Sequence, residues 1–181
     1  MGRGKLIVFS GPACSGKSTL AARLAEELTI PHLAMDQTRA RLMPGSPHTR
    51  EDRAVAYRAM HWAAELLAGG GLSVILDAPY GHPEDRRELG QIAARAGAAL
   101  FLIECRVSPE VALARFRQRQ RGPRRDLTEE RVDELVREFR YCGRGLLLDT
   151  GSLDVGGCLA LIRQYLSTGR PVPRGGWIGQ P

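Results

Sequence analysis

The residues best suited to chemistry lie near the start of the chain, in the stretch GPACSGKST at 11–19. Its spacing, Gly11-x-x-x-x-Gly16-Lys17-Ser18, matches the phosphate-binding loop, or P-loop. The glycines let successive backbone N–H groups converge on phosphate oxygens, and a following helix adds the positive end of its dipole. Lys17 is expected to reach the β- and γ-phosphates of ATP, and the Ser18 hydroxyl to ligate Mg²⁺. The nucleotide-binding residues predicted here are Gly11, Pro12, Ala13, Cys14, Ser15, Gly16, Lys17, Ser18 and Thr19.

The sequence argues against two other kinds of P-loop protein. A GTPase would carry the guanine-reading string N-K-x-D, which does not occur, and the one D-x-x-G, Asp154 to Gly157, comes far too late in the chain. A mechanical ATPase is expected to be longer and to have paired acids after a strand, whereas the apolar run at 72–76 is followed by Asp77 alone. A kinase is therefore favoured over a switch or a motor. A simple glycine turn is disfavoured because the motif stands between an apolar run and an amphipathic segment.

Two further groups are candidates for handling the phosphoryl acceptor. Asp36-Gln37-Thr38-Arg39 follows a short apolar segment. Transfer to a hydroxyl needs a carboxylate that orients and deprotonates it, and Arg39, one helical turn on, can hold an anionic group of the acceptor. The alternative is that Asp36 only caps a helix. Asp77 can hold Mg²⁺ through water or position the acceptor, the alternative being a loop-capping carboxylate.

A basic window provides candidates for stabilising the transition state. Six arginines fall within eleven residues that contain no acid: Arg115, Arg117, Arg119, Arg121, Arg124 and Arg125. The window contains Gly122-Pro123, so we expect a lid at about 115–127 that closes over the nucleotide. Arg115 and Arg119 are one helical turn apart and are the first candidates to contact ATP, with Arg121 and Arg125 behind them. For some of the six, a solvated helix face is the expected alternative.

The elements that must position these residues alternate between strand and helix. Apolar runs predict strands at 5–10, 32–35, 72–76, 98–105 and 146–148. Amphipathic or capped segments predict helices at 17–28, 36–43, 50–67, 83–96, 108–120, 128–141 and 154–166. Because every predicted strand is a continuous apolar run, we expect an α/β fold with a five-stranded parallel sheet covered on both faces. Asp36, Asp77 and Asp149 then lie at the carboxyl ends of strands, where such sheets bind ligands.

Composition sets the remaining expectations. The 181 residues suit one domain at 1–167, followed by a loose Gly/Pro-rich tail at 168–181. The net charge of +6 favours a polyanionic partner. The low aromatic content of 6%, however, does not indicate a surface of aromatic side chains on which nucleic-acid bases could stack. The four cysteines show no metal-ligand spacing and are expected to be reduced thiols of a cytoplasmic protein. The run at 5–10 is interpreted as a strand rather than a signal peptide, and no stretch approaches the ~18 apolar residues of a membrane span.

Four blocks of the sequence resemble a known family. GPACSGKST, DQTR at 36–39, VILDAPYGHPEDRREL at 74–89 and SPEVALARFRQRQR at 108–121 are similar to small P-loop kinases of the AAA_33 group, which includes the phage-type polynucleotide 5′-hydroxyl kinases. Zeta-toxin-like kinases, gluconate kinases and chloramphenicol phosphotransferases are more distant relatives. The resemblance covers about residues 5–165. It implies a three-layer P-loop kinase fold with an Arg-rich lid.

The same resemblance implies roles for individual residues. Asp36 corresponds to the general base and Arg39 to an acceptor contact. Asp77 and Arg86, with Pro83 and Arg87, match an acceptor-site block at a slightly different spacing. Arg115 and Arg119 correspond to lid arginines on the ATP phosphates, and the adenine is expected near 149–152.

The predicted function is an ATP- and Mg²⁺-dependent kinase that transfers the γ-phosphoryl group to a hydroxyl. The 5′-hydroxyl of a polynucleotide is the first candidate acceptor. A nucleoside, sugar or antibiotic hydroxyl is the alternative. An ATP-binding regulatory module, in which the nucleotide controls a partner, is the alternative of another class.

Overall fold

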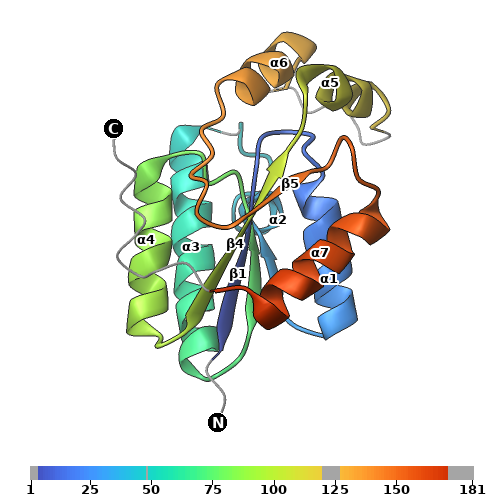
Figure 1. Ribbon diagram of the computed structural model, residues 1–181. Helices are drawn as coiled ribbons and strands as arrows, with labels where there is room; N and C mark the ends of the chain where they lie inside the picture. The colour runs from blue at the N-terminus through green and yellow to red at the C-terminus, as the bar shows by residue number, and fades with distance from the viewer. Residues whose placement is uncertain (1–3, 48, 120–126, 171–181) are drawn as a thin grey trace.

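The computed structural model describes residues 4–47, 49–119 and 127–170. Within them, five parallel strands form one sheet in the order β2-β3-β1-β4-β5 (Figure 1). The strands are β1 (Lys5–Ser10), β2 (His32–Ala34), β3 (Val74–Asp77), β4 (Ala99–Arg106) and β5 (Leu146–Asp149). The order places β1, which leads into the P-loop, at the centre of the sheet.

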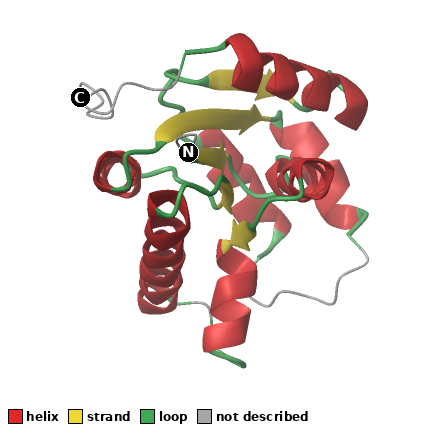
Figure 2. Ribbon diagram, turned by 90° about the horizontal axis from the view of Figure 1, so that it is seen from below, coloured by secondary structure: helices red, strands yellow, loops and turns green. Residues whose placement is uncertain are grey.

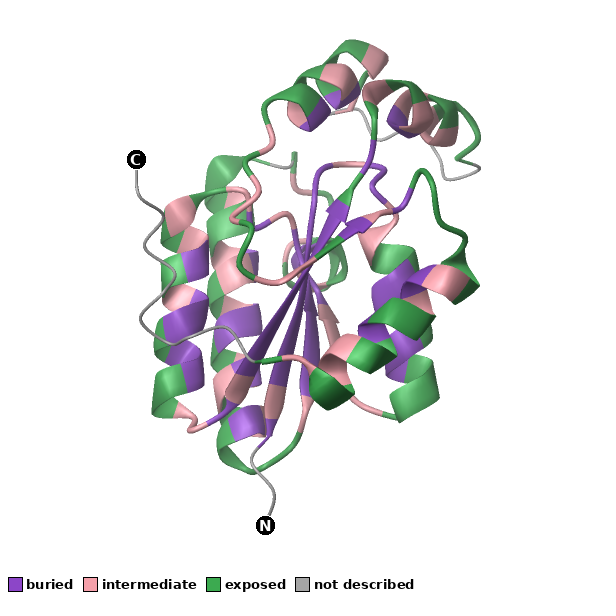
Figure 3. Cartoon of the chain, in the orientation of Figure 1, coloured by how far each residue is buried: buried purple, intermediate pink, exposed green. Residues whose placement is uncertain are grey.

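Helices cover both faces of this sheet, giving three layers (Figure 2). On one face, α3 (Arg50–Gly69) and α4 (Pro83–Arg95) pack on Leu6 and Val8 of β1. On the other face, α1 (Lys17–Leu28) and α7 (Val155–Thr168) pack on Ile7 and Phe9. Since successive strand residues point to opposite faces, both sets must be apolar, which explains the continuous runs in the sequence. Figure 3 shows the resulting buried strands between helices that are exposed on their outer sides.

The remaining helices lie around the carboxyl ends of the strands. The short α2 (Met35–Leu42) follows β2 and packs against α3. The pair α5 (Pro109–Arg117) and α6 (Glu129–Arg137) stands above the sheet in Figure 1. Val132 and Val136 of α6 and Ala112 of α5 form a small core with Cys14 of the P-loop. This contact places α5 and α6, the helices on either side of the predicted lid loop, directly beside the phosphate-binding loop.

The fold class is confirmed, with differences at particular elements. The edge strands β2 and β5 are only partly buried, because each has a neighbouring strand on one side alone. The helix expected to reach residue 141 ends at Arg137. The backbone beyond it bonds to other elements instead: Glu104 accepts hydrogen bonds from the N–H groups of Cys142 and Gly143, both at 2.8 Å.

The remaining predictions concern the lid, the tail, the cysteines and membrane-spanning segments. Arg121, Arg124, Arg125 and most of the predicted lid loop lie outside the described residues, as do residues 171–181 of the predicted tail. All four cysteines are free thiols. Across 4–47, 49–119 and 127–170, no helix is both long enough and apolar enough to cross a membrane.

Candidate active site

The P-loop joins the end of β1 to the start of α1. Gly11 has φ +151°, and a Cβ there would lie 2.6 Å from the Cys105 carbonyl oxygen and 2.7 Å from Ser15 Oγ. Only glycine fits that position. Gly16, with φ +80°, turns the chain into α1. The Gly11 N–H donates to the carbonyl of Pro79 at 3.1 Å, so the segment after β3 supports the start of the loop.

The groups that follow Gly16 suit an anionic ligand. Lys17 is half-buried, and its Nζ donates to the Pro12 carbonyl at 3.3 Å, inside the loop. Ser18 and Thr19 are exposed at the start of α1. The first turn of α1 contains no acidic residue of its own that would compete for the positive end of the helix dipole. This arrangement can receive the phosphates of a nucleotide.

Asp77, at the end of β3, is only 4% exposed. Its Oδ2 lies 3.8 Å from His32 Nε2, while Oδ1 has no hydrogen-bond partner among the described residues. Burial alone would raise the pKa of this carboxyl group, but His32, Lys17 and Ser18 together hold its pKa below the usual value. Asp77 is therefore a buried, ionised carboxylate beside the P-loop.

The residues fit a divalent cation that is bound together with a nucleotide. No cluster of three or more His, Cys, Asp or Glu that could hold a metal occurs in the described part of the chain, so a cage made of protein groups alone is not available there. Mg²⁺ is commonly bound by one or two protein oxygens together with substrate phosphates. The Ser18 hydroxyl and the unpartnered Oδ1 of Asp77 match that requirement.

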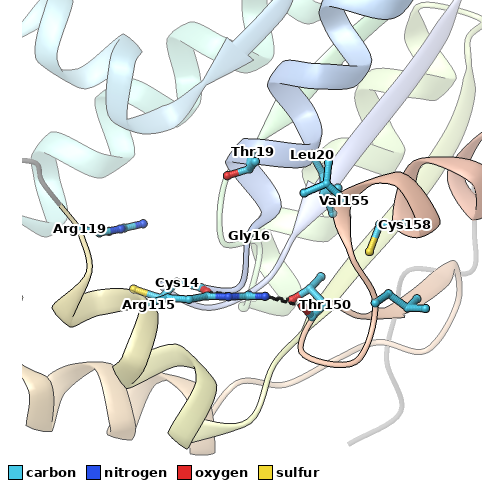
Figure 4. A pocket seen from close by; sticks show the side chains of 10 residues that line it. Cys14, Gly16, Thr19, Leu20, Arg115, Arg119, Thr150, Val155 and Cys158 are labelled. Atoms are coloured by element: carbon cyan, nitrogen blue, oxygen red, sulfur yellow. Dashed lines mark hydrogen bonds between the residues drawn. The ribbon is translucent and has the colours of Figure 1, made fainter.

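A pocket of about 320 Å³ opens beside the P-loop (Figure 4). Its walls come from three parts of the chain that are distant in sequence: the P-loop with α1, the end of α5, and the segment from β5 into α7. Its lining residues are Cys14, Gly16, Thr19, Leu20, Arg115, Arg119, Thr150, Leu153, Val155 and Cys158. The apolar side chains near the start of α7 give one wall that can accept the flat face of a base.

Arg115 lies in this pocket, but its guanidinium already has protein partners. It donates to the Cys14 carbonyl at 3.3 Å and to Thr150 Oγ1 at 3.1 Å, and it also donates to the Thr150 carbonyl. Thr150 is buried, and its hydroxyl donates to the Ser15 carbonyl at 2.7 Å. Arg115 and Thr150 thus join α5, the P-loop and the loop after β5. No sequence pattern predicted a role for Thr150, although it lies in the segment 149–152 where the adenine was expected.

Arg119 differs from Arg115. It follows the end of α5, is exposed and lines the pocket, toward which its side chain points in Figure 4. Unlike that of Arg115, its guanidinium makes no hydrogen bond or ion pair with any other residue that the structure describes. Of the two predicted lid arginines, Arg119 is the one whose guanidinium is not bound to another described residue.

Asp36 and Arg39 belong to α2. That helix begins at Met35, and its N-cap is Ala34, so Asp36 is not the capping residue and that alternative is wrong. Asp36 is exposed in the first turn, whereas Arg39 is only 6% exposed. The Nε of Arg39 has no hydrogen-bond partner within the described ranges. Their roles as base and acceptor contact stay predictions.

Arg86 is buried within the protein. Only 5% exposed, it donates to the carbonyls of Tyr80 at 3.3 Å and of Arg140 at 2.8 Å. It therefore joins the loop after β3 to the segment after α6. These two bonds give Arg86 a structural role that the sequence did not indicate. Its contact with an acceptor stays a prediction.

An aromatic cluster under the loop after β3 was also missed. The rings of His61 and Tyr80 stack at 5.9 Å, and His61 Nε2 lies 3.2 Å from the Tyr80 hydroxyl. The Tyr80 N–H donates to the Tyr57 hydroxyl at 3.3 Å, although Tyr80 has the uncommon φ of +49°. Because α3 and the loop are distant in sequence, no local sequence pattern predicts that these rings support the segment that carries Asp77 and Pro79.

Comparison with known proteins identifies relatives of this site and fold. The family model AAA_33, described as an AAA domain, matches residues 6–141. Adenylyl-sulfate kinase of Deinococcus deserti is 36% identical over 94 residues, which is 49% of this chain and 52% of that protein. An uncharacterised protein of Mycobacterium tuberculosis is 30% identical over 81% of this chain and 32% of its own length. Cytidylate kinase of Nitratidesulfovibrio vulgaris is 26% identical over 90% of this chain and 92% of its own.

Solved structures share the fold. The APS kinase of Mycobacterium tuberculosis, in complex with AMPPNP and APS, has a TM-score of 0.72 at 22% identity and covers 93% of this chain and 100% of its own. A sugar kinase from Janibacter has a TM-score of 0.70 at 18% identity, covering 96% and 98%. The chain spans about half the length of the Deinococcus relative and about a third of the mycobacterial one.

Proposed function

Because the chain belongs to the AAA_33 family, we propose that it is an ATP-dependent phosphotransferase that moves the γ-phosphoryl group to a hydroxyl. One observation carries the proposal. A complete P-loop stands beside a buried, ionised Asp77 whose Oδ1 has no partner among the described residues. A nucleotide with its divalent cation would satisfy both features.

The donor half of the site is the P-loop with the adjoining pocket. Backbone N–H groups and Lys17 would bind the phosphates, and the pocket between α5 and α7 would receive the base and ribose. That the similar APS kinase structure holds AMPPNP supports ATP as the nucleotide. Ser18 and Asp77 would hold Mg²⁺, which supplies positive charge to the β- and γ-phosphate oxygens.

The acceptor half of the site contains Asp36 and Arg39. In the proposed reaction, the acceptor hydroxyl gives its proton to Asp36 while its oxygen bonds to the γ-phosphorus. The bond from that phosphorus to the β–γ bridging oxygen breaks, and ADP leaves with the electron pair. Arg119 would stabilise the charge on the transferred oxygens, while Arg115 would hold the P-loop and the loop after β5 in place.

The charges of α5 and α6, the helices on either side of the predicted lid loop, bear on the identity of the acceptor. Arg117, Arg131 and Arg137 form ion pairs with Glu129, Glu134 and Asp133, respectively. Much of the basic character of α5 and α6 is therefore neutralised locally, which favours a small-molecule acceptor over the 5′-hydroxyl of a polynucleotide. The names of the adenylyl-sulfate and cytidylate kinases, which are both similar in sequence, support the same choice. The four free thiols fit a reducing compartment such as the cytoplasm.

The proposal is tested by phosphoryl transfer from γ-labelled ATP to a panel of metabolites, with a 5′-hydroxyl oligonucleotide beside them. Transfer to a metabolite supports the small-molecule assignment. Transfer to the oligonucleotide, with binding that weakens steeply as salt is raised, would reverse it. No transfer to any acceptor, together with ATP-dependent binding of a protein partner, would replace the kinase with a regulatory module.

A further inference from the structure

The strand register brings His32 and Asp77 to the same face of the sheet. His32 of β2 is paired with Ile75 of β3, and Ala34 is paired with Asp77. Ile75 packs in the core cluster beneath α1 and α7. Residues two apart on a strand share a face, so His32, Ile75 and Asp77 all lie on the α1 side. His32 is thereby the diagonal neighbour of Asp77, although 45 residues separate them in sequence.

The two side chains meet in a partly closed environment. His32 Nε2 lies 3.8 Å from Asp77 Oδ2, with the His32 side chain 15% exposed and that of Asp77 4%. This separation is slightly too long for a hydrogen bond. Nε2 of His32 and Oδ1 of Asp77 are both buried atoms without a hydrogen-bond partner in the part of the chain that the structure describes. A small movement of either side chain would complete the contact.

The residues paired with Asp77 on the neighbouring strands cannot orient its carboxylate, whereas His32 can. Ala34, directly paired with Asp77 on β2, offers only a methyl group. Phe9, its partner on β1, offers only a ring. Lys17 and Ser18 approach from the P-loop, where they are expected to serve the nucleotide. His32 is therefore the polar side chain of the neighbouring strands that is available to orient the carboxylate.

We infer that His32 is a positioning residue for Asp77, binding Oδ2 so that Oδ1 stays available to the divalent cation that accompanies ATP. The inference rests on the proposed function, because it assigns His32 to the metal side of that site. Partners that orient a metal-binding side chain commonly change metal affinity by about 10- to 100-fold when removed. His32 would act on metal binding and on kcat without touching the nucleotide base or the acceptor.

Two substitutions at position 32, each introducing a side-chain amide, distinguish hydrogen bonding to Asp77 from a role in packing alone. In His32→Gln the amide nitrogen falls near the position of Nε2, so a donor to Asp77 is kept. In His32→Asn the amide is one methylene shorter and does not reach. The measurement is Mn²⁺ affinity in the presence of AMPPNP, followed by electron paramagnetic resonance, with AMPPNP affinity in EDTA and the melting temperature measured beside it. His82→Asn, at an exposed histidine, is the matched control.

We expect His32→Asn to weaken Mn²⁺ binding about tenfold while His32→Gln and His82→Asn stay close to wild type. Metal-free AMPPNP binding should be unchanged in all three. Equal Mn²⁺ affinities for the Asn and Gln variants at position 32 would overturn the role of His32 and leave the proposed function standing. A wild-type protein that binds AMPPNP without any dependence on the divalent cation would overturn the proposed function and this inference together.

Discussion

Arg115 and Thr150, from α5 and from the loop after β5, are joined through both the hydroxyl and the carbonyl of the threonine. The same hydroxyl donates to the Ser15 carbonyl, and Arg115 donates to that of Cys14. Two carbonyls of the P-loop are thus held by residues more than one hundred positions away. We expect the shape of the loop to depend on this pair.

Thr150→Val should weaken ATP binding. Valine keeps the volume and the backbone carbonyl, but it lacks the hydroxyl that donates to Ser15 and accepts from Arg115. Losing a net hydrogen bond of about 1 kcal/mol or slightly more corresponds to roughly a tenfold rise in Kd. Calorimetry with AMPPNP measures it. Thr168→Val, at a hydroxyl that bonds only within the end of α7, is the control. Unaltered affinity in Thr150→Val would mean that the P-loop keeps its shape without the threonine.

Arg119→Ala should lower kcat on the order of 10³-fold with a smaller change in ATP affinity, because an arginine that meets the transferred oxygens acts mainly in the transition state. Steady-state kinetics with the identified acceptor provide the comparison. Arg117→Ala is a neighbouring control, since Arg117 is ion-paired with Glu129 and does not line the pocket. Similar losses in both variants would indicate a general charge effect rather than a specific contact.

Asp36→Asn should lower kcat by about 10²- to 10⁴-fold, the range for loss of a general base. ATP affinity should change little, because Asp36 lies on α2 and is not among the residues that line the nucleotide pocket. Kinetics and AMPPNP binding are measured on the same preparation. Glu51→Gln, at an exposed carboxylate in the first turn of α3, controls for loss of surface charge. A fully active Asp36→Asn enzyme would remove Asp36 from the mechanism.

His61 should make stability depend on pH. Burial lowers the pKa of His61 despite Glu88 at 3.1 Å and the nearby Asp85. In the unfolded chain His61 binds a proton below about pH 6.5, whereas in the folded protein the lowered pKa delays this protonation to a lower pH. The His61 contribution to stability is therefore full above that pH and falls as the pH is lowered toward the folded pKa.

Urea unfolding at several pH values between 7.5 and 5.5 tests this expectation. His61→Phe keeps a ring against Tyr80 but does not titrate, so its free energy of unfolding should fall less over this range than that of the wild type. Parallel pH profiles for the two proteins would show that another group governs the acid sensitivity.

Arg86→Ala should destabilise the fold. The substitution leaves the carbonyls of Tyr80 and Arg140 without their donor, and an unpaired buried polar group costs about 1–3 kcal/mol. Chemical denaturation measures the loss, and Arg87→Ala at the exposed neighbour should change stability little. If Arg86→Ala instead keeps its stability and raises only the acceptor KM, the acceptor contact implied by the family resemblance is the better assignment.

The sequence by itself determined the local features of this protein. Gly11 to Ser18 specify a phosphate-binding loop because glycine backbones and a helix start create that geometry within a few residues. The apolar runs predicted five parallel strands because a strand covered on both faces must be apolar throughout, and order along the chain then placed Asp36 and Asp77 at carboxyl ends.

Only the tertiary structure decided which of these side chains are already engaged. Arg115, Arg119, Arg39 and Arg86 look alike in the sequence. Yet Arg115 holds Thr150, Arg86 holds two carbonyls, Arg39 is buried beside α3, and Arg119 faces the pocket. His32 meets Asp77 only through the register of β2 and β3. These differences arise from packing between segments far apart in the chain, which sets burial and hydrogen bonding independently of local residue pattern.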